Sequence, residues 1–137
     1  MDDTALKSLL DSSRTVAIVG LSTDPEKTSS KIAEILIGAG YDVIPVHPKA
    51  AEILGRKAYA SLADIPVPVD IVDVFRPADE AEGIARQAVA IGAMTLWLQL
   101  GIASAEARAV AEGAGIRYVE DTCIGATTER LGNRAAA

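Results

Sequence analysis

The sequence has little of what several common kinds of site require. Among its 137 residues it holds one cysteine, Cys123, and one histidine, His47. A single cysteine excludes an internal disulfide and a cysteine-based metal cluster. The net charge of −6 argues against general nucleic-acid binding, since such proteins are usually basic. We therefore expect no metal site and no nucleic-acid partner.

Long apolar runs are missing as well. Glycine, proline or charged residues interrupt every apolar stretch before it reaches the length of a membrane span. The opening residues, MDDTALKSLL, are acidic and lack the apolar core of a signal peptide. Because half of the residues are nevertheless hydrophobic, the chain can bury a full core. These features predict one cytoplasmic domain over 1–137 and no membrane partner.

Two familiar nucleotide-binding motifs are absent. The turn after the first apolar run, GLSTDP, has one glycine where the dinucleotide-binding pattern GxGxxG has three. After the second predicted strand, His47-Pro48 stands where NAD and FAD proteins carry an acidic residue for the ribose. The P-loop pattern is missing too. These absences argue against a nucleoside triphosphatase and against an NAD(P)-dependent oxidoreductase, which we keep as an alternative.

What the sequence does contain is a strand, a turn and a helix over 15–39. The apolar run 16–19 is rich in β-branched residues and ends at Gly20, as in a strand buried on both faces. Helical spacing follows over about 29–37, with Thr28 or Ser29 as the predicted N-cap. The free N–H groups of such a helix start face the turn and favour anions, phosphate above all.

The rest of the chain continues the same alternation. Residues 49–61 look irregular, 133–137 are expected to fray, and short helices are expected at 4–10 and 127–131. Further strands are predicted at 41–46, 69–75, 94–98 and 116–119, a helical turn at 61–66, and helices at 78–91 and 104–114 with Ser104 as N-cap. This pattern predicts a Rossmann-like α/β fold: a doubly wound five-stranded parallel sheet with helices on both faces and strand order 3-2-1-4-5.

Ligands of such sheets bind beyond the carboxyl ends of the strands, at the point where the strand order reverses. Here that point is expected between the first and fourth strands. The residues predicted to meet at this edge are Gly20, Leu21, Ser22, His47, Pro48, Arg76, Gln99 and Cys123.

Six segments, in order, resemble a known family. They are VAIVGLSTDPEKTSSKIA, VIPVHPK, LGRKAYASLADIP, VDIVDVFR, LWLQLG and EDTCI. Together they are similar to the bacterial and archaeal coenzyme A-binding family, single-domain Rossmann-like proteins that resemble the coenzyme A-binding domain of the succinyl-CoA synthetase α subunit. The resemblance covers about residues 12–131.

The resemblance implies coenzyme A as the ligand. Backbone N–H groups of Gly20, Leu21 and Ser22 would approach the pyrophosphate, and Ser29 at the helix start would complete the cradle. Lys27 and Lys31 would supply charge for phosphate. His47 replaces the asparagine more usual in the family, and Pro48 would shape the adenine pocket. A carboxylate after the second strand would repel the 3′-phosphate of coenzyme A, which agrees with its absence.

Several residues keep two interpretations. His47 either contacts adenosine or is a turn residue, and Arg76 lies either at the pocket edge or on the open surface. Cys123 either meets the pantetheine arm, where it could form a mixed disulfide with the thiol, or is a small buried side chain. Trp97 is expected in the core, and Asp70 and Asp73 are spaced to lie on opposite faces of a strand.

No catalytic constellation stands out. The sequence therefore predicts a module that binds coenzyme A, or a short acyl-CoA, through the first strand–helix turn without catalysis of its own. The oxidoreductase, and a coenzyme A-binding subunit of an acyl-CoA ligase that acts with a partner, are the alternatives. Whether the chain forms a homo-oligomer or has a protein partner stays open.

Overall fold

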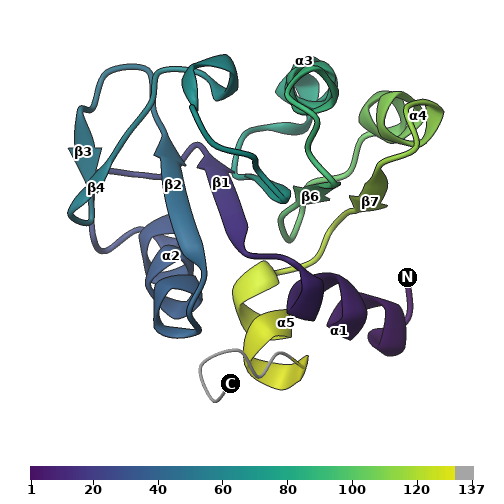
Figure 1. Ribbon diagram of the computed structural model, residues 1–137, viewed down its shortest axis with the longest axis horizontal. Coiled ribbons are helices and arrows are strands. Elements are labelled where there is room, and N and C mark those ends of the chain that lie inside the picture. Colours follow the sequence, from purple (N-terminus) through teal and green to yellow (C-terminus); the bar gives the residue numbers. More distant parts are fainter. Residues whose placement is uncertain (132–137) are drawn as a thin grey trace.

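The computed structural model describes residues 1–131 (Figure 1), so the expected fraying of 133–137 lies outside the described residues. Its centre is a parallel sheet, which confirms the Rossmann-like α/β class. The five strands of this sheet are β1 (Thr15–Val19), β2 (Asp42–Val46), β5 (Ile71–Val74), β6 (Thr95–Leu98) and β7 (Arg117–Val119).

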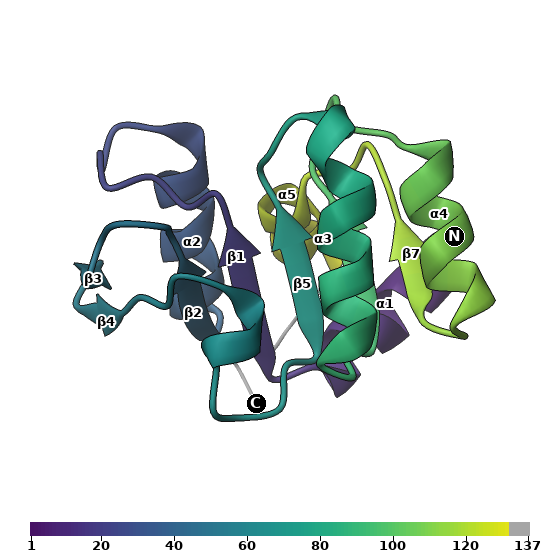
Figure 2. The same cartoon turned by 90° about the horizontal axis from the view of Figure 1, so that it is seen from above.

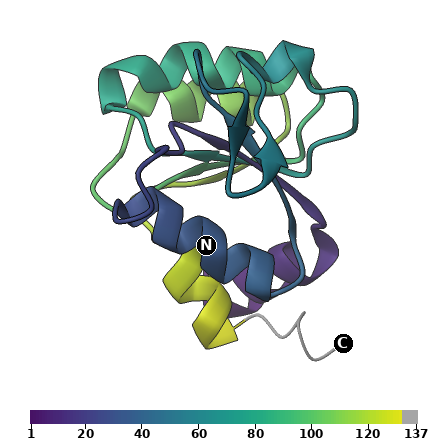
Figure 3. The ribbon, with the colours of Figure 1, turned by 90° about the vertical axis from the view of Figure 1, so that its left-hand side faces the viewer.

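Helices cover both faces of the sheet, as the alternating pattern predicts (Figure 3). The five helices are α1 (Asp3–Ser12), α2 (Thr28–Gly38), α3 (Ala78–Ala90), α4 (Ala105–Gly113) and α5 (Ile124–Leu131). One face carries α1, α2 and α5, and the other carries α3, α4 and the single turn η1 (Leu62–Asp64). Each face has its own apolar cluster. Because β1 is buried between them, Val16, Ala17 and Ile18 are fully inaccessible.

The strand order differs from the prediction. It is β2-β1-β5-β6-β7, so the third strand of the main sheet pairs with β1 and not with the outer edge of β2. The predicted order 3-2-1-4-5 is wrong because that outer edge is already covered. The Tyr59 N–H donates to the Pro45 carbonyl at 3.0 Å, and the Tyr59 carbonyl accepts from the His47 N–H at 2.9 Å.

A hairpin accompanies this contact. Residues 49–61, expected to be irregular, contain β3 (Glu52–Ile53) and β4 (Arg56–Lys57), which pair antiparallel. Figure 2 shows the hairpin outside β2. The chain therefore crosses over β1 to form β5, and the strand order reverses between β1 and β5. The reversal still lies at the carboxyl end of β1, where the sequence places the site.

Two helix starts test the capping predictions. Ser104 caps α4, since its Oγ accepts from the Ala107 N–H at 3.0 Å, as predicted. The N-cap of α2 is Lys27, which makes no side-chain cap, so the prediction of Thr28 or Ser29 is wrong. Ser29 lies inside the helix, where its Oγ accepts a hydrogen bond from the preceding loop.

No helix of residues 1–131 combines the length and the apolar character needed to cross a membrane.

Candidate functional site

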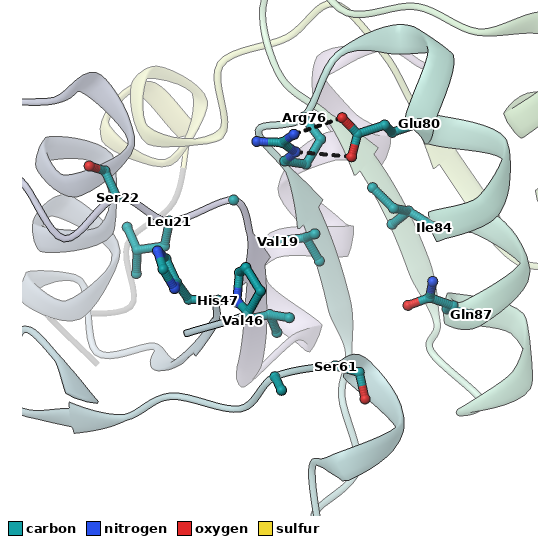
Figure 4. Close-up of a pocket in the computed structure, with 13 residues that line it drawn as sticks. Val19, Leu21, Ser22, Val46, His47, Ser61, Arg76, Glu80, Ile84 and Gln87 are labelled. Carbon is teal, nitrogen blue, oxygen red and sulfur yellow. Dashed lines mark hydrogen bonds and ion pairs between the residues drawn. The ribbon is translucent and has the colours of Figure 1, made fainter. Parts of the chain in front are cut away.

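A cavity of about 580 Å³ opens at the carboxyl ends of β1 and β2 (Figure 4). One wall comes from the turn after β1 and the loop after β2, and the opposite wall comes from α3. Val19 and Val46 provide apolar surface at the strand ends. Of the residues predicted from the sequence, six line this cavity: Gly20, Leu21, Ser22, His47, Pro48 and Arg76.

Gly20 makes the turn after β1 possible. Its φ of +93° is a conformation that side chains disfavour. A Cβ atom there would lie 2.9 Å from Cδ of Arg76 and 3.0 Å from the carbonyl oxygen of Phe75. The Gly20 N–H donates a hydrogen bond to the Val46 carbonyl at 3.3 Å. The glycine therefore lets the loop after β5 pass directly over the turn.

The turn is held by two serines of α2. The Ser22 N–H donates to Ser29 Oγ at 3.0 Å, and Ser30 Oγ donates to the Ser22 carbonyl at 3.2 Å. The Leu21 side chain is buried in the core, while its N–H has no hydrogen-bond partner within residues 1–131. Of the three predicted phosphate-facing N–H groups, the Leu21 N–H is thus the one left available in this conformation.

His47 both holds its loop and lines the cavity. Its Nδ1 accepts the Lys49 N–H at 3.0 Å and the Ala50 N–H at 2.9 Å. An asparagine oxygen organises turns in the same way, so the imidazole performs the task of a turn-forming amide. With Nδ1 as acceptor, the neutral ring carries its proton on Nε2. Figure 4 shows His47 among the side chains that line the cavity.

Arg76 reaches the cavity from the loop after β5, which supports the pocket-edge interpretation over the open-surface one. Its Nε donates to Glu80 Oε1 at 3.1 Å, and its Nη2 donates to Glu80 Oε2 at 2.7 Å. The hydrogen bond to Glu80 raises the pKa of Arg76 and lowers the pKa of Glu80, so both groups are charged. The cavity thus contains a paired cation and anion close to the Gly20 turn.

Comparison with known proteins places the chain in a family. The family described as CoA binding domain matches residues 14–129. The chain belongs to this family. This CoA-binding family member is also 38% identical over 119 residues to the protein YneT of Bacillus subtilis (strain 168), a match covering 87% of this chain and 88% of YneT.

Solved structures with the same fold agree over nearly the whole chain. A hypothetical protein from Pyrococcus horikoshii OT3 is similar at 35% identity with a TM-score of 0.93, covering 96% of this chain and 92% of that one. A Thermus thermophilus protein is similar at 35% identity with a TM-score of 0.90, covering 96% and 99%. An acetyl-coenzyme A synthetase from Ca. Korarchaeum cryptofilum, at 24% identity and a TM-score of 0.73, shares the fold, and this chain covers 31% of it.

Five of the predicted site residues of this CoA-binding family member lie away from the cavity lining. Ser29 is buried in α2, where its Oγ accepts the Ser22 N–H. Lys27 and Lys31 are exposed at the start of α2. Gln99 is buried, and its Oε1 accepts the Ile124 N–H at 3.0 Å. Cys123 is half-buried, with Sγ accepting the Ala126 N–H at 3.5 Å. In this conformation Gln99 and Cys123 therefore accept backbone N–H groups in the first turn of α5.

Sequence reasoning missed one wall of the cavity. Glu80, Ile84 and Gln87 of α3 line it, together with Ser61 just before η1. The three α3 residues are spaced by four and three positions, which places them on one helical face. That spacing was visible in the sequence, but it could be assigned to the site only after the strand order had placed α3 next to β1.

A buried carboxyl lies outside the cavity. Asp73 of β5 is fully inaccessible, and neither of its oxygens has a hydrogen-bond partner among the described residues. Its neighbours in register are Ile18 and Trp97, both also fully buried. Burial raises the pKa of Asp73 well above its ordinary value and thereby favours the neutral form of the carboxyl. Within residues 1–131, no group of three or more His, Cys, Asp or Glu is placed to hold a metal ion.

Proposed function

We propose that the chain binds coenzyme A, or a short acyl-CoA, in the cavity beside the Gly20 turn and has no catalytic step of its own. The observation that carries the proposal is that an unpaired backbone N–H and an arginine flank a cavity at the reversal point of the sheet. Membership of the CoA binding domain family supports the choice of ligand. A turn that favours phosphate, next to apolar cavity surface, suits a ligand that combines a phosphate with an apolar ring.

The pyrophosphate would lie at the turn. There the Leu21 N–H, and the Nη1 group of Arg76 that Glu80 does not use, would bind phosphate oxygens. Ser29 holds the turn by accepting the Ser22 N–H. Lys27 and Lys31, at the start of α2 and outside the cavity, would attract phosphates through solvent.

The adenine ring would occupy the apolar slot. Val19, Val46 and Ile84 would offer apolar surface to the ring, and Pro48 lines the same cavity. Beyond them, Ser61 and Gln87 provide a hydroxyl and an amide for the polar edge of the base (Figure 4). The Nε2–H of His47 would donate to the sugar or base.

The pantetheine arm would leave the slot past the turn, toward the start of α5. Gln99 and Cys123 lie at that helix start. Under oxidation, the thiol of coenzyme A and the Cys123 thiol would form a mixed disulfide, with both protons and two electrons passing to an added oxidant such as diamide. Mass spectrometry should detect this adduct and its loss after reduction. A missing adduct would remove Cys123 from the proposed site.

Titration calorimetry of the purified chain tests the main proposal, using coenzyme A, dephospho-coenzyme A and NAD. We expect coenzyme A to bind, and dephospho-coenzyme A to bind more weakly because it lacks the 3′-phosphate. Ser61→Ala and Gln87→Ala should weaken coenzyme A binding. Gln87→Glu keeps the length of the side chain and replaces the amide group with a carboxylate, so it tests whether the amide contributes to binding. Binding of NAD alone would support the oxidoreductase alternative and contradict the proposal.

Absence of catalysis has its own support and test. The only histidine of the sequence uses Nδ1 to hold its loop, and the charged groups of Glu80 and Arg76 at the cavity are bonded to each other. Incubation with acetyl-CoA should therefore release no thiol above the rate of a buffer blank. Thiol release that saturates with acetyl-CoA would show an enzyme. A stoichiometric partner recovered with the chain would instead favour a ligase subunit.

A further inference from the structure

The Arg76–Glu80 pair spans the edge of the cavity. Arg76 comes from the loop after β5, Glu80 from the first turn of α3, and both line the cavity (Figure 4). Their side chains are 47% and 44% exposed, so the pair is open to solvent and to a ligand. The stem of Arg76 passes over Gly20, since its Cδ lies 2.9 Å from where a Gly20 Cβ would stand. The guanidinium group of Arg76 is thus held beside the Gly20 turn, where phosphate is expected to bind.

The pairing uses the part of Arg76 that a phosphate would use. Arginine binds carboxylates and phosphates through two parallel N–H groups, and here Nε and Nη2 both donate to Glu80. A phosphate at the turn would therefore meet an arginine whose charge is neutralised, next to the Glu80 carboxylate. Full use of Arg76 by the ligand requires that Glu80 be released.

Release costs little free energy. Solvent-exposed ion pairs contribute little to stability, because water solvates the separated partners well. Glu80 also keeps a favourable position after release, since it lies in the first turn of α3, where negative charge is stabilised by the helix N-terminus. Two arrangements of the guanidinium, on Glu80 or on a ligand phosphate, are therefore close in energy.

We propose that Arg76 and Glu80 form an exchangeable clamp, in which a ligand phosphate takes Arg76 from Glu80, and that Glu80 thereby sets the affinity for phosphorylated ligands. Glu80 lowers that affinity by competing for the guanidinium. It also rejects anions that lack the geometry to replace both of its hydrogen bonds. This inference rests on the proposed function, because it needs a phosphate-bearing ligand in the cavity.

A double-mutant cycle tests the clamp. Calorimetry would measure coenzyme A affinity for the wild type, Glu80→Gln, Arg76→Gln and the double variant. We expect Glu80→Gln to tighten binding about two- to fivefold, the range given by an exposed ion pair. Arg76→Gln should weaken binding. In the Arg76→Gln background, Glu80→Gln should change the affinity by less than about twofold, because no guanidinium is left to compete for.

Two controls distinguish the clamp from a general effect of negative charge on α3. Glu82 pairs with Arg86 on the same helix at 2.7 Å, and neither residue lines the cavity, so Glu82→Gln should leave the affinity unchanged. Adenosine, which has no phosphate, should bind Glu80→Gln and the wild type equally.

Two results would overturn the clamp. Equal tightening by Glu80→Gln in both backgrounds would show direct repulsion between Glu80 and the ligand. Unchanged affinity in Glu80→Gln would show that the pair does not compete. If the wild type binds no coenzyme A, the proposed function fails first, and this outcome is distinct from both.

Discussion

At the scale of single residues, Gly20 has a conformational and a steric role at once. We expect Gly20→Ala to lower the free energy of unfolding by about 1–3 kcal/mol from backbone strain alone, because φ is +93°. The added Cβ would also push Arg76 off the turn. Urea unfolding measures the change. The matched control is Gly83→Ala in α3, where the new Cβ would meet no atom within 4 Å apart from its chain neighbours and the backbone of its own helix, and stability should rise by about 1 kcal/mol. Equal effects at the two glycines would contradict the prediction.

Asp73 makes a second residue-scale prediction, on pH. Burial raises its pKa, so the folded state keeps a proton that the unfolded state releases near pH 4. The contribution of this group to stability is therefore complete below about pH 4 and is lost as the pH rises, by at most about 1.4 kcal/mol per pH unit. Asp73→Asn has no such proton to lose. Its stability relative to the wild type should increase as the pH is raised above about 4, measured by urea unfolding.

Thr95→Val is the control for this prediction. Thr95 Oγ1 is also buried without a partner among the described residues, but it does not ionise in this range. The substitution should raise stability by about 1 kcal/mol, equally at every pH, because it removes a desolvated hydroxyl. Parallel curves for Asp73→Asn and the wild type would show that the Asp73 carboxyl is ionised in the folded state.

At the scale of elements, the first turn of α5 depends on a side chain that follows β6. Gln99 Oε1 accepts the Ile124 N–H, one of the N–H groups that a helix cannot satisfy itself. Gln99→Met keeps the length of the side chain but removes the acceptor, and should cost about 1–3 kcal/mol of unfolding free energy. The same change at the exposed Gln87 should stay within about 0.5 kcal/mol. A negligible cost at Gln99 would contradict this role.

The strands were predictable as elements, while their order was not. Each strand is a short apolar run with a clear end, and all five lie where expected. The order depends on Tyr59, whose two backbone hydrogen bonds cover the edge of β2. Nothing in the composition of residues 49–61 distinguishes such an edge cover from an ordinary loop. The start of α2 shows the same limit, because Ser29 has the composition of a cap but is used for the loop before the helix.

At the scale of the whole molecule, the first and last described helices form one layer. α1 and α5 lie side by side on one face of the sheet, and Arg130 pairs with Asp3 at 2.7 Å (Figure 1). They cover the region that holds Asp73, whose carboxyl has no hydrogen-bond partner among residues 1–131. We expect both helices to open together, at a lower free energy than β1 and β5. Native-state hydrogen exchange measures this. Exchange of α1 at the rate of the central strands would contradict it.

The candidate site was predictable on one side only. The turn after β1 and the loop after β2 lie close in sequence to recognisable strand ends, so their residues were found. The α3 wall required knowledge that α3 lies next to β1, which follows from the strand order. Gln99 and Cys123 were placed at the right edge of the sheet, but in this conformation their polar atoms hold α5, because a buried polar atom must first find its own partner.

The position of Trp97 gives the molecule a built-in optical probe. It is the only tryptophan in the sequence, is fully buried as expected, and donates its Nε1–H to the Thr122 carbonyl at 2.8 Å. Its ring lies in the layer beneath α1 and α5, on the face of the sheet opposite to α3. Its fluorescence should therefore be blue-shifted in the folded chain and move to the red when that layer opens. Adenosine, which enters only the cavity, should leave the emission unchanged, whereas a pantetheine arm at the start of α5 should alter it through the neighbouring Thr122 carbonyl.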